Sequence, residues 1–142
     1  MAGCRRPHFE HLFIKNFMQF IQTNSAPQAI GPYSQGIKVD NFYFFSGQIA
    51  LTADGIFLDK SVEIQTKQIL ENIKNILLSE NLKKENVVKS TIFLKNIEDF
   101  DVVNKIYAEF FGEHKPARST VEVSRLPKNA KIEIEILAYK IK

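Results

Sequence analysis

Residues 131–139 carry the pattern that most restricts how this chain can fold. Isoleucine and glutamate alternate there at every position from Ile132 to Ile136. Because successive side chains of a β-strand point to opposite faces, one face of this segment is apolar and the other carries two carboxylates. The pattern therefore predicts a strand that packs against a hydrophobic core on one side only.

Further patterns predict the rest of a single α+β domain. Runs of β-prone residues indicate strands near residues 42–46, 87–94 and 119–123, before the one described above. Apolar residues at helical spacing indicate helices over residues 62–79 and 99–111. The expected order along the chain is β-β-α-β-α-β-β. Since each helix is long enough to cross between strands, we expect two helices on one face of a mixed sheet.

The opposite face of such a sheet would be exposed in a lone copy of the chain. Identical sheets that associate around a symmetry axis would cover it. We therefore expect an oligomer, and a symmetric ring of sheets is one arrangement that covers this face.

Residues 1–15 differ from the rest of the chain, and we treat them as an extension before a domain of residues 16–142. Phenylalanines recur at i, i+4 and i+8 from Phe9, with Phe20 and Ile21 nearby, and this spacing suggests an amphipathic helical stripe. Few acidic residues and an apolar face are typical of a transit peptide. The segment is either a targeting signal for a mitochondrion or plastid or an upstream extension, in which case we expect a cytoplasmic protein.

The composition argues against several classes of partner. The chain has 19 basic and 16 acidic residues, a net charge of +3, to which residues 1–15 contribute three basic and one acidic residue. A body so close to neutral is not built to neutralise a phosphate backbone. One cysteine and three histidines allow no internal disulfide, no Cys-based zinc site and no known metal motif. We expect no metal and no nucleic acid, and the absence of a long apolar run argues against a membrane span.

Two charged residues of the expected strands are candidates for chemistry. Arg118 follows Pro116 at a strand entrance, where its planar guanidinium suits bidentate binding of a carboxylate. Paired with Glu122 on the surface, it would have no such role. Glu133 is either a solvated carboxylate or, buried at an interface, a group that holds or activates water. We expect Arg118 and Glu133 on neighbouring strands.

Positions in loops and in the second helix are further candidates. Tyr33 lies between two glycines in the rigid loop 30–36, which is either a binding loop or a structural turn. Ser46 and Gly47 end a strand, and the glycine lets a ligand approach the backbone. Asn104 lies in the second expected helix, where an exposed polar residue is the default.

An ordered set of motifs connects these candidates to a known family. The motifs are APQAIGPYSQ at 26–35, FSGQI at 45–49, VVN at 102–104 with Tyr107 and FF at 110–111, PARS at 116–119, VEV at 121–123, RLPK at 125–128 and IEIE at 132–135. Together they resemble the RidA/YjgF family, also called the L-PSP or reactive intermediate/imine deaminase family. The resemblance covers about residues 19–140.

The resemblance implies a fold, an assembly and an activity. The fold is a chorismate-mutase-like α+β domain that forms a homotrimer, in which three sheets make an inner barrel and the sites lie between subunits. Family members hydrolyse reactive enamine and imine intermediates, such as 2-aminoacrylate/2-iminopropanoate and 2-iminobutanoate, to 2-oxo acids and ammonia. They need no cofactor or metal.

The resemblance also implies roles for particular residues. Arg118 would bind the substrate carboxylate, and Glu133 would orient or activate the attacking water. The further substrate-binding residues that it implies are Tyr33, Ser46, Gly47 and Asn104. Two departures from the family pattern are present. Thr120 stands where some members have a cysteine, which argues against thiol-dependent behaviour, and the segment 112–115 is shorter than in some relatives, which would reshape the rim of the pocket.

Three alternative functions remain open on the sequence. An endoribonuclease or translation inhibitor is reported for some family members, but the weak charge and the lack of a histidine acid–base pair argue against it. A non-catalytic trimer could bind 2-oxo acids through the same arginine. A chorismate mutase is less well supported, because similarity of fold does not carry function.

Overall fold

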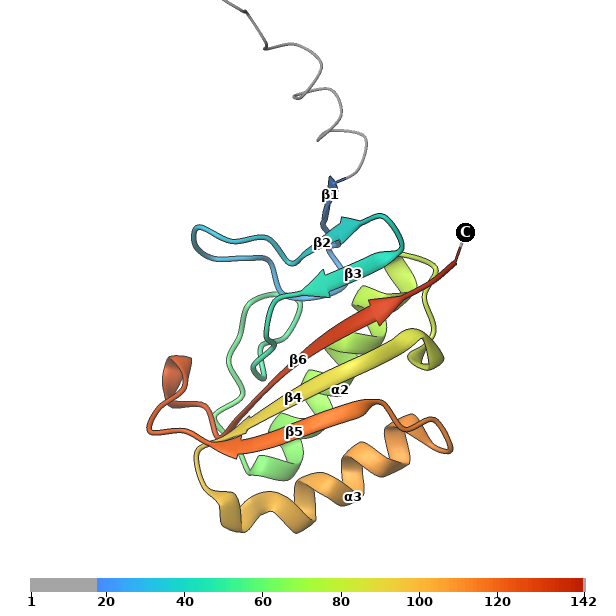
Figure 1. The fold of residues 1–142 in the computed structure, drawn as a ribbon. Coiled ribbons are helices and arrows are strands. Elements are labelled where there is room, and N and C mark those ends of the chain that lie inside the picture. Colours follow the sequence, from blue (N-terminus) through green and yellow to red (C-terminus); the bar gives the residue numbers. More distant parts are fainter. Residues whose placement is uncertain (1–17, 142) are drawn as a thin grey trace, which may run out of the picture.

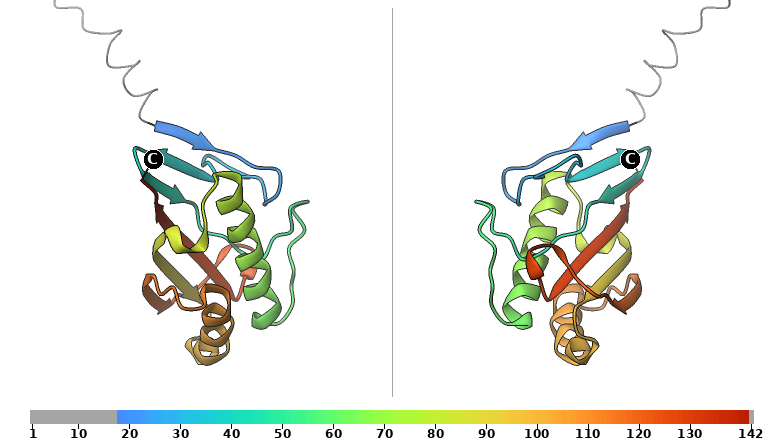
Figure 2. Two further views of the ribbon diagram at one scale, coloured as in Figure 1. Left: turned by 90° about the vertical axis from the view of Figure 1, so that its right-hand side faces the viewer. Right: turned by 90° about the vertical axis from the view of Figure 1, so that its left-hand side faces the viewer.

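A six-stranded mixed sheet forms the frame of the molecule in the computed structural model, which describes residues 18–141 (Figure 1). The strands are β1 (Met18–Ile21), β2 (Gly36–Val39), β3 (Phe42–Phe45), β4 (Val87–Leu94), β5 (Ala117–Glu122) and β6 (Ile132–Tyr139). Their order across the sheet is β1-β2-β3-β6-β4-β5, with β4 and β5 parallel and the other neighbours antiparallel. Helices α2 (Val62–Ser79) and α3 (Phe100–Phe111) both cover one face of this sheet (Figure 2).

The structure confirms the predicted α+β class and adds one strand at its start. Helix α2 and strand β4 have the predicted limits, and α3 begins one residue later than expected. Three strands rather than two precede α2, because residues of the expected helical stripe form β1. Phe20 pairs with Ile37 and Ile21 with Gly36, so the helical interpretation was wrong for both. The rest of that stripe, and the targeting interpretation of residues 1–15, lie outside the described residues.

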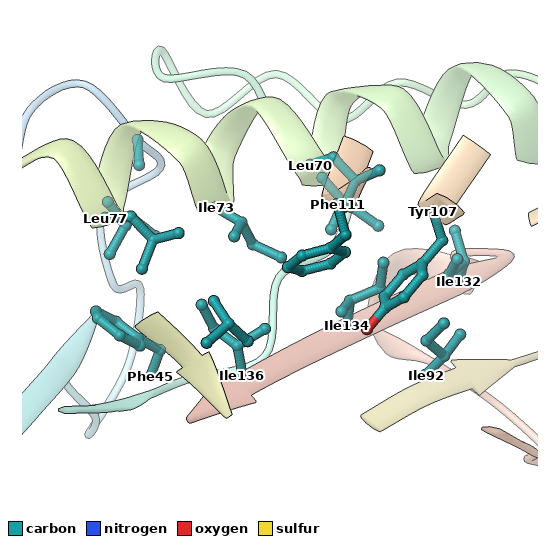
Figure 3. Packing of buried hydrophobic residues seen from close by; sticks show 14 of the residues in the cluster. Phe45, Leu70, Ile73, Leu77, Ile92, Tyr107, Phe111, Ile132, Ile134 and Ile136 are labelled. Carbon is teal, nitrogen blue, oxygen red and sulfur yellow. The ribbon is translucent and has the colours of Figure 1, made fainter. Parts of the chain in front are cut away.

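The alternation along β6 fixes which side of the sheet meets the core. Ile132 and Ile134 are fully buried and Ile136 nearly so. Figure 3 shows Ile134 and Ile136 facing side chains of α2 and α3. Each such side chain stabilises the fold by about 1.5–3 kcal/mol on burial. Because these three isoleucines face the helices, Glu133 and Glu135 must point to the opposite side of the sheet.

The opposite side of the sheet carries apolar side chains that face solvent in a single copy. One row crosses four strands through Phe20, Ile37, Phe44 and Leu137, which are paired in register. Phe20 is 73% exposed and Phe44 50%. A contiguous exposed apolar surface of this kind is typical of an interaction site. The predicted uncovered face is therefore present, and we call it the open face.

Neither α2 nor α3 combines the length and the apolar character that a bilayer-spanning helix needs.

Candidate functional site

Glu133 lies on the open face, in a pocket of about 580 Å³. The pocket is also lined by Tyr33, Ser46 and Gly47 from other segments and by Glu135 from the same strand. Its floor is β6 and its walls are the end of β3 and the loop after β1. The structure thus brings together four of the six predicted site residues, Tyr33, Ser46, Gly47 and Glu133.

A β-bulge at the end of β3 shapes this pocket. Phe44 pairs with Leu137, and the next pairing joins Gln48 to Ile134, so β3 has one residue more than β6 between the two pairs. Bulges of this kind bend a strand and are frequent beside active sites. Here the bulge places Gly47 directly against the Glu133 carboxylate. A Cβ atom on Gly47 would overlap Oε1 of Glu133, so any other residue there would displace the carboxylate from this position.

The loop that carries Tyr33 is held by the buried side chain of Gln35. Its Nε2 donates to the carbonyls of Thr23 (3.0 Å) and Pro27 (2.7 Å), while its Oε1 accepts from the Thr23 N–H (2.6 Å). Ser46 adds a second link, because its hydroxyl donates to the Ser34 carbonyl at 2.6 Å. The ring of Tyr33, 54% exposed, is therefore presented at the pocket rim by a rigid loop.

Arg118 lies on the other side of the sheet, under α3. It pairs in register with Ser90, which is fully buried on the helix-covered face. A second pocket, of about 360 Å³, lies between α3 and β5, and its lining includes Arg118, Asn104 and Tyr107. The two remaining predicted site residues, Arg118 and Asn104, are thus brought together, but away from Glu133.

The expected placement of Arg118 and Glu133 on neighbouring strands was wrong. Strand β4 lies between β5 and β6, because β6 returns antiparallel between β3 and β4. The two residues also point to opposite faces of the sheet. One chain therefore presents two separate half-sites: an arginine half-site with Arg118 and Asn104, and a glutamate half-site with Glu133, Tyr33, Ser46 and Gly47.

The two half-sites differ in electrostatic character. Burial raises the pKa of the Glu133 carboxyl above its ordinary value, and the like charge of Glu135 raises it further. Arg118 lies over the rings of Phe100 and Tyr107. Glu122, the surface partner considered for Arg118, instead accepts a hydrogen bond from the backbone N–H of Ile97 at 3.0 Å. The glutamate half-site thus contains a carboxyl group of raised pKa, and the arginine half-site offers a cation to an anionic ligand.

Sequence reasoning missed Phe100, Ser90 and the role of Tyr107 in the arginine half-site. The guanidinium carbon of Arg118 lies 4.8 Å from the ring centroid of Tyr107 and 5.7 Å from that of Phe100. The Tyr107 hydroxyl is hydrogen-bonded to that of Ser90 at 2.6 Å. The sequence singled out Tyr107 only as part of a family motif, and no local pattern connects α3 to a strand beyond it.

Residues 18–141 contain no cluster of three or more histidine, cysteine or acidic side chains that could hold a metal ion.

The chain is similar in sequence and in structure to proteins that match most of its length. The family description "Endoribonuclease L-PSP" matches residues 23–140. A RutC family protein of Pyrococcus horikoshii is 50% identical over 123 residues, which cover 86% of this chain and 98% of that protein. Reactive Intermediate Deaminase A, chloroplastic, of Arabidopsis thaliana is 48% identical over 121 residues, covering 84% of this chain and 65% of that protein. The crystal structure of Escherichia coli TdcF with bound serine matches with a TM-score of 0.82 at 39% identity, covering 87% of this chain and 99% of that one.

Proposed function

This chain belongs to the endoribonuclease L-PSP family, the family of RidA and YjgF, and we propose that it hydrolyses reactive enamine and imine intermediates to 2-oxo acids and ammonia. The expected substrates are 2-aminoacrylate/2-iminopropanoate and 2-iminobutanoate. The observation that supports this most is the chemistry of the two half-sites. Arg118 offers a guanidinium fork to a carboxylate, and Glu133 offers a half-buried carboxyl of raised pKa to a water.

The proposed active site forms between two copies of the chain. Arg118 and Glu133 point to opposite faces of one sheet, so a single substrate meets both only if one copy supplies each. The exposed apolar row of the open face supports such an association. In a closed ring each copy uses two different surfaces, so every junction joins one arginine half-site to one glutamate half-site. A homotrimer with an inner barrel would have three such sites.

The proposed reaction assigns a separate task to each half-site. Arg118 binds the substrate carboxylate in a bidentate pair, which fixes the imine carbon. The substrate reacts as the protonated imine, and Glu133 accepts a proton from water as the water oxygen bonds to the imine carbon, which gives a neutral carbinolamine. Glu133 then returns this proton to the nitrogen, and the C–N bond breaks. The hydroxyl proton passes to the departing ammonia, so the products are the 2-oxo acid and an ammonium ion. A carboxyl of raised pKa suits both directions of proton transfer.

Two relatives support the substrate class. The Arabidopsis thaliana protein carries the name Reactive Intermediate Deaminase A. The Escherichia coli TdcF structure contains serine, which has the α-carboxylate that Arg118 is proposed to bind here. The same ligand group on a similar fold favours small 2-imino and 2-oxo acids for this chain.

A direct assay tests the proposal. A dehydratase that acts on serine generates 2-aminoacrylate in situ, and pyruvate appearance is compared with wild type, Arg118→Ala and no added protein. We expect wild type to accelerate pyruvate formation and Arg118→Ala to lose that acceleration. Arg125→Ala, which removes the same charge from an exposed position, should retain it. A folded, assembled wild type without acceleration would overturn the proposal, and metal-free RNA cleavage that survives Arg118→Ala would favour the endoribonuclease.

The pH dependence of this activity should report the pKa of Glu133. The carboxylate form accepts the proton from water, so kcat/KM falls as the pH drops through the pKa of Glu133. Because that pKa is raised, the acid limb should lie above the ordinary glutamate value of 4.5. Glu135→Gln removes the neighbouring negative charge, so its acid limb should move to lower pH. An unchanged or upward-shifted limb in Glu135→Gln would contradict this assignment.

The close approach of Gly47 to Glu133 leads to a further prediction. Gly47→Ala places a methyl group where the carboxylate lies, and the displaced carboxylate should lower kcat/KM by about 10²-fold. Gly55→Ala is the control. Gly55 has a positive φ of 84°, with no atom within 4 Å of an added Cβ, so alanine there should destabilise the fold without affecting activity. Thermal unfolding and steady-state kinetics on both variants separate the two effects, and an active Gly47→Ala would argue against a fixed position for Glu133.

A further inference from the structure

Arg118 rests on two aromatic rings of α3, which we name the aromatic shelf. The shelf consists of Phe100 and Tyr107, seven residues apart on the helix. The guanidinium carbon is within 6 Å of both ring centroids, the range in which a cation is attracted to an aromatic face. A flexible side chain held by two rings about two helical turns apart has few remaining orientations.

The Tyr107 ring is itself fixed from the sheet. Tyr107 is only 7% exposed, and its hydroxyl forms a 2.6 Å hydrogen bond with the buried Ser90 (Figure 3 shows the ring reaching from α3 toward the sheet). Ser90 is also the residue that pairs with Arg118 in register between β4 and β5. Three elements therefore meet at this point, and the orientation of the ring follows from the packing of the core.

The shelf holds the guanidinium without neutralising it. A carboxylate partner from the same chain would compete with an anionic ligand, but the carboxylate of Glu122 is hydrogen-bonded to the Ile97 N–H. Aromatic faces attract a cation and leave its five N–H donors, which lie in the guanidinium plane, free to reach a ligand. Burial raises the pKa of Tyr107, which keeps its phenol neutral beside the cation.

We propose that Phe100 and Tyr107 are positioning residues, which aim the Arg118 guanidinium at the substrate carboxylate. This inference rests on the proposed function insofar as it places a substrate carboxylate at Arg118. Removal of a ring should leave Arg118 charged but mobile. The cost then appears as weaker carboxylate binding, a higher Kd and KM, with a smaller effect on the chemical step.

The test measures carboxylate binding apart from catalysis. Isothermal titration with 2-oxobutanoate gives Kd and stoichiometry for wild type, Tyr107→Leu, Phe100→Leu and Tyr107→Phe, and kcat and KM are measured on the same preparations. We expect both leucine variants to raise Kd and KM by about 3–30-fold at unchanged stoichiometry. Tyr107→Phe, which restores the ring face, should recover most of the affinity. The matched control is Phe110→Leu, which removes a ring on the same helix away from Arg118.

Each outcome decides the inference. Leucine variants with the same Kd as Phe110→Leu would overturn it, as would a lower stoichiometry at wild-type Kd, which indicates partly unfolded protein. Phe100 is 37% exposed, so Phe100→Leu should fold even if Tyr107→Leu does not. In that case the Kd of Phe100→Leu alone decides whether the inference holds. If the Kd values change as expected but the protein hydrolyses no imine, the positioning role of the shelf is supported and the proposed reaction is wrong. If wild type does not bind 2-oxobutanoate, both the positioning role and the proposed reaction are wrong.

Discussion

Mixing two inactive variants, Arg118→Ala and Glu133→Gln, is expected to restore about a quarter of wild-type activity. Each variant lacks one half-site and keeps the other, because the two half-sites lie on opposite faces of the sheet. In rings mixed randomly from equal amounts, a junction works only when its arginine half-site comes from the Glu133→Gln variant and its glutamate half-site from the Arg118→Ala variant, which holds for one junction in four. The measurement is pyruvate formation after the variants are dissociated together in mild denaturant and reassembled.

Two controls make this result specific. The double variant Arg118→Ala/Glu133→Gln supplies neither half-site, so mixing it with either single variant should restore nothing. Each single variant taken through the same reassembly should stay inactive. If mass spectrometry shows mixed rings in the reassembled sample and the sample is still inactive, the proposal that the active site lies between copies is wrong.

Glu133→Gln alone should lower kcat by about 10²–10⁴-fold. Glutamine has nearly the same shape as glutamate and still hydrogen-bonds to water, but it does not accept the proton at neutral pH. Binding of 2-oxobutanoate should persist, since Arg118 is unchanged and the buried negative charge near the ligand is removed. Steady-state kinetics and titration of the same protein give both quantities.

The control for this substitution is two residues along the same strand and face. Glu135→Gln removes an identical charge from a more exposed position and should keep kcat within a few-fold of wild type at neutral pH. If Glu133→Gln binds and turns over as wild type does, Glu133 takes no part in proton transfer. If neither wild type nor the variant turns over but both bind the 2-oxo acid, the metabolite-binding alternative is correct.

Local sequence pattern predicted the elements that depend on local chemistry. Helix α2 begins at Val62, directly after Ser61, whose side chain accepts a hydrogen bond from the Ile64 N–H as an N-cap. The alternation along β6 correctly separated a core face from a polar face. Strand β1 was missed because a four-residue edge strand with mixed apolar residues has no periodicity of its own, and its conformation follows from pairing with β2.

The arrangement of the candidate residues could not be predicted from the sequence. The sequence pattern marked Arg118 and Glu133 as candidates and the resemblance implied their roles, and the structure places each of them in the lining of a different pocket. Their separation by β4 depends on strand order, which is set by long-range pairing and leaves no mark on either segment. The contact of Arg118 with Tyr107 likewise joins a strand to a helix that precedes it in the chain, so only the folded structure shows it.

The register of β6 against β4 determines both how the core packs and which face of the sheet carries Glu133. A slip of β6 by one residue against β4 would turn every isoleucine toward the pocket and both glutamates toward the helices. Such a slip would abolish the core at the moment it removed the carboxylate. A chain whose isoleucines of β6 are packed in the core therefore also carries Glu133 on the open face.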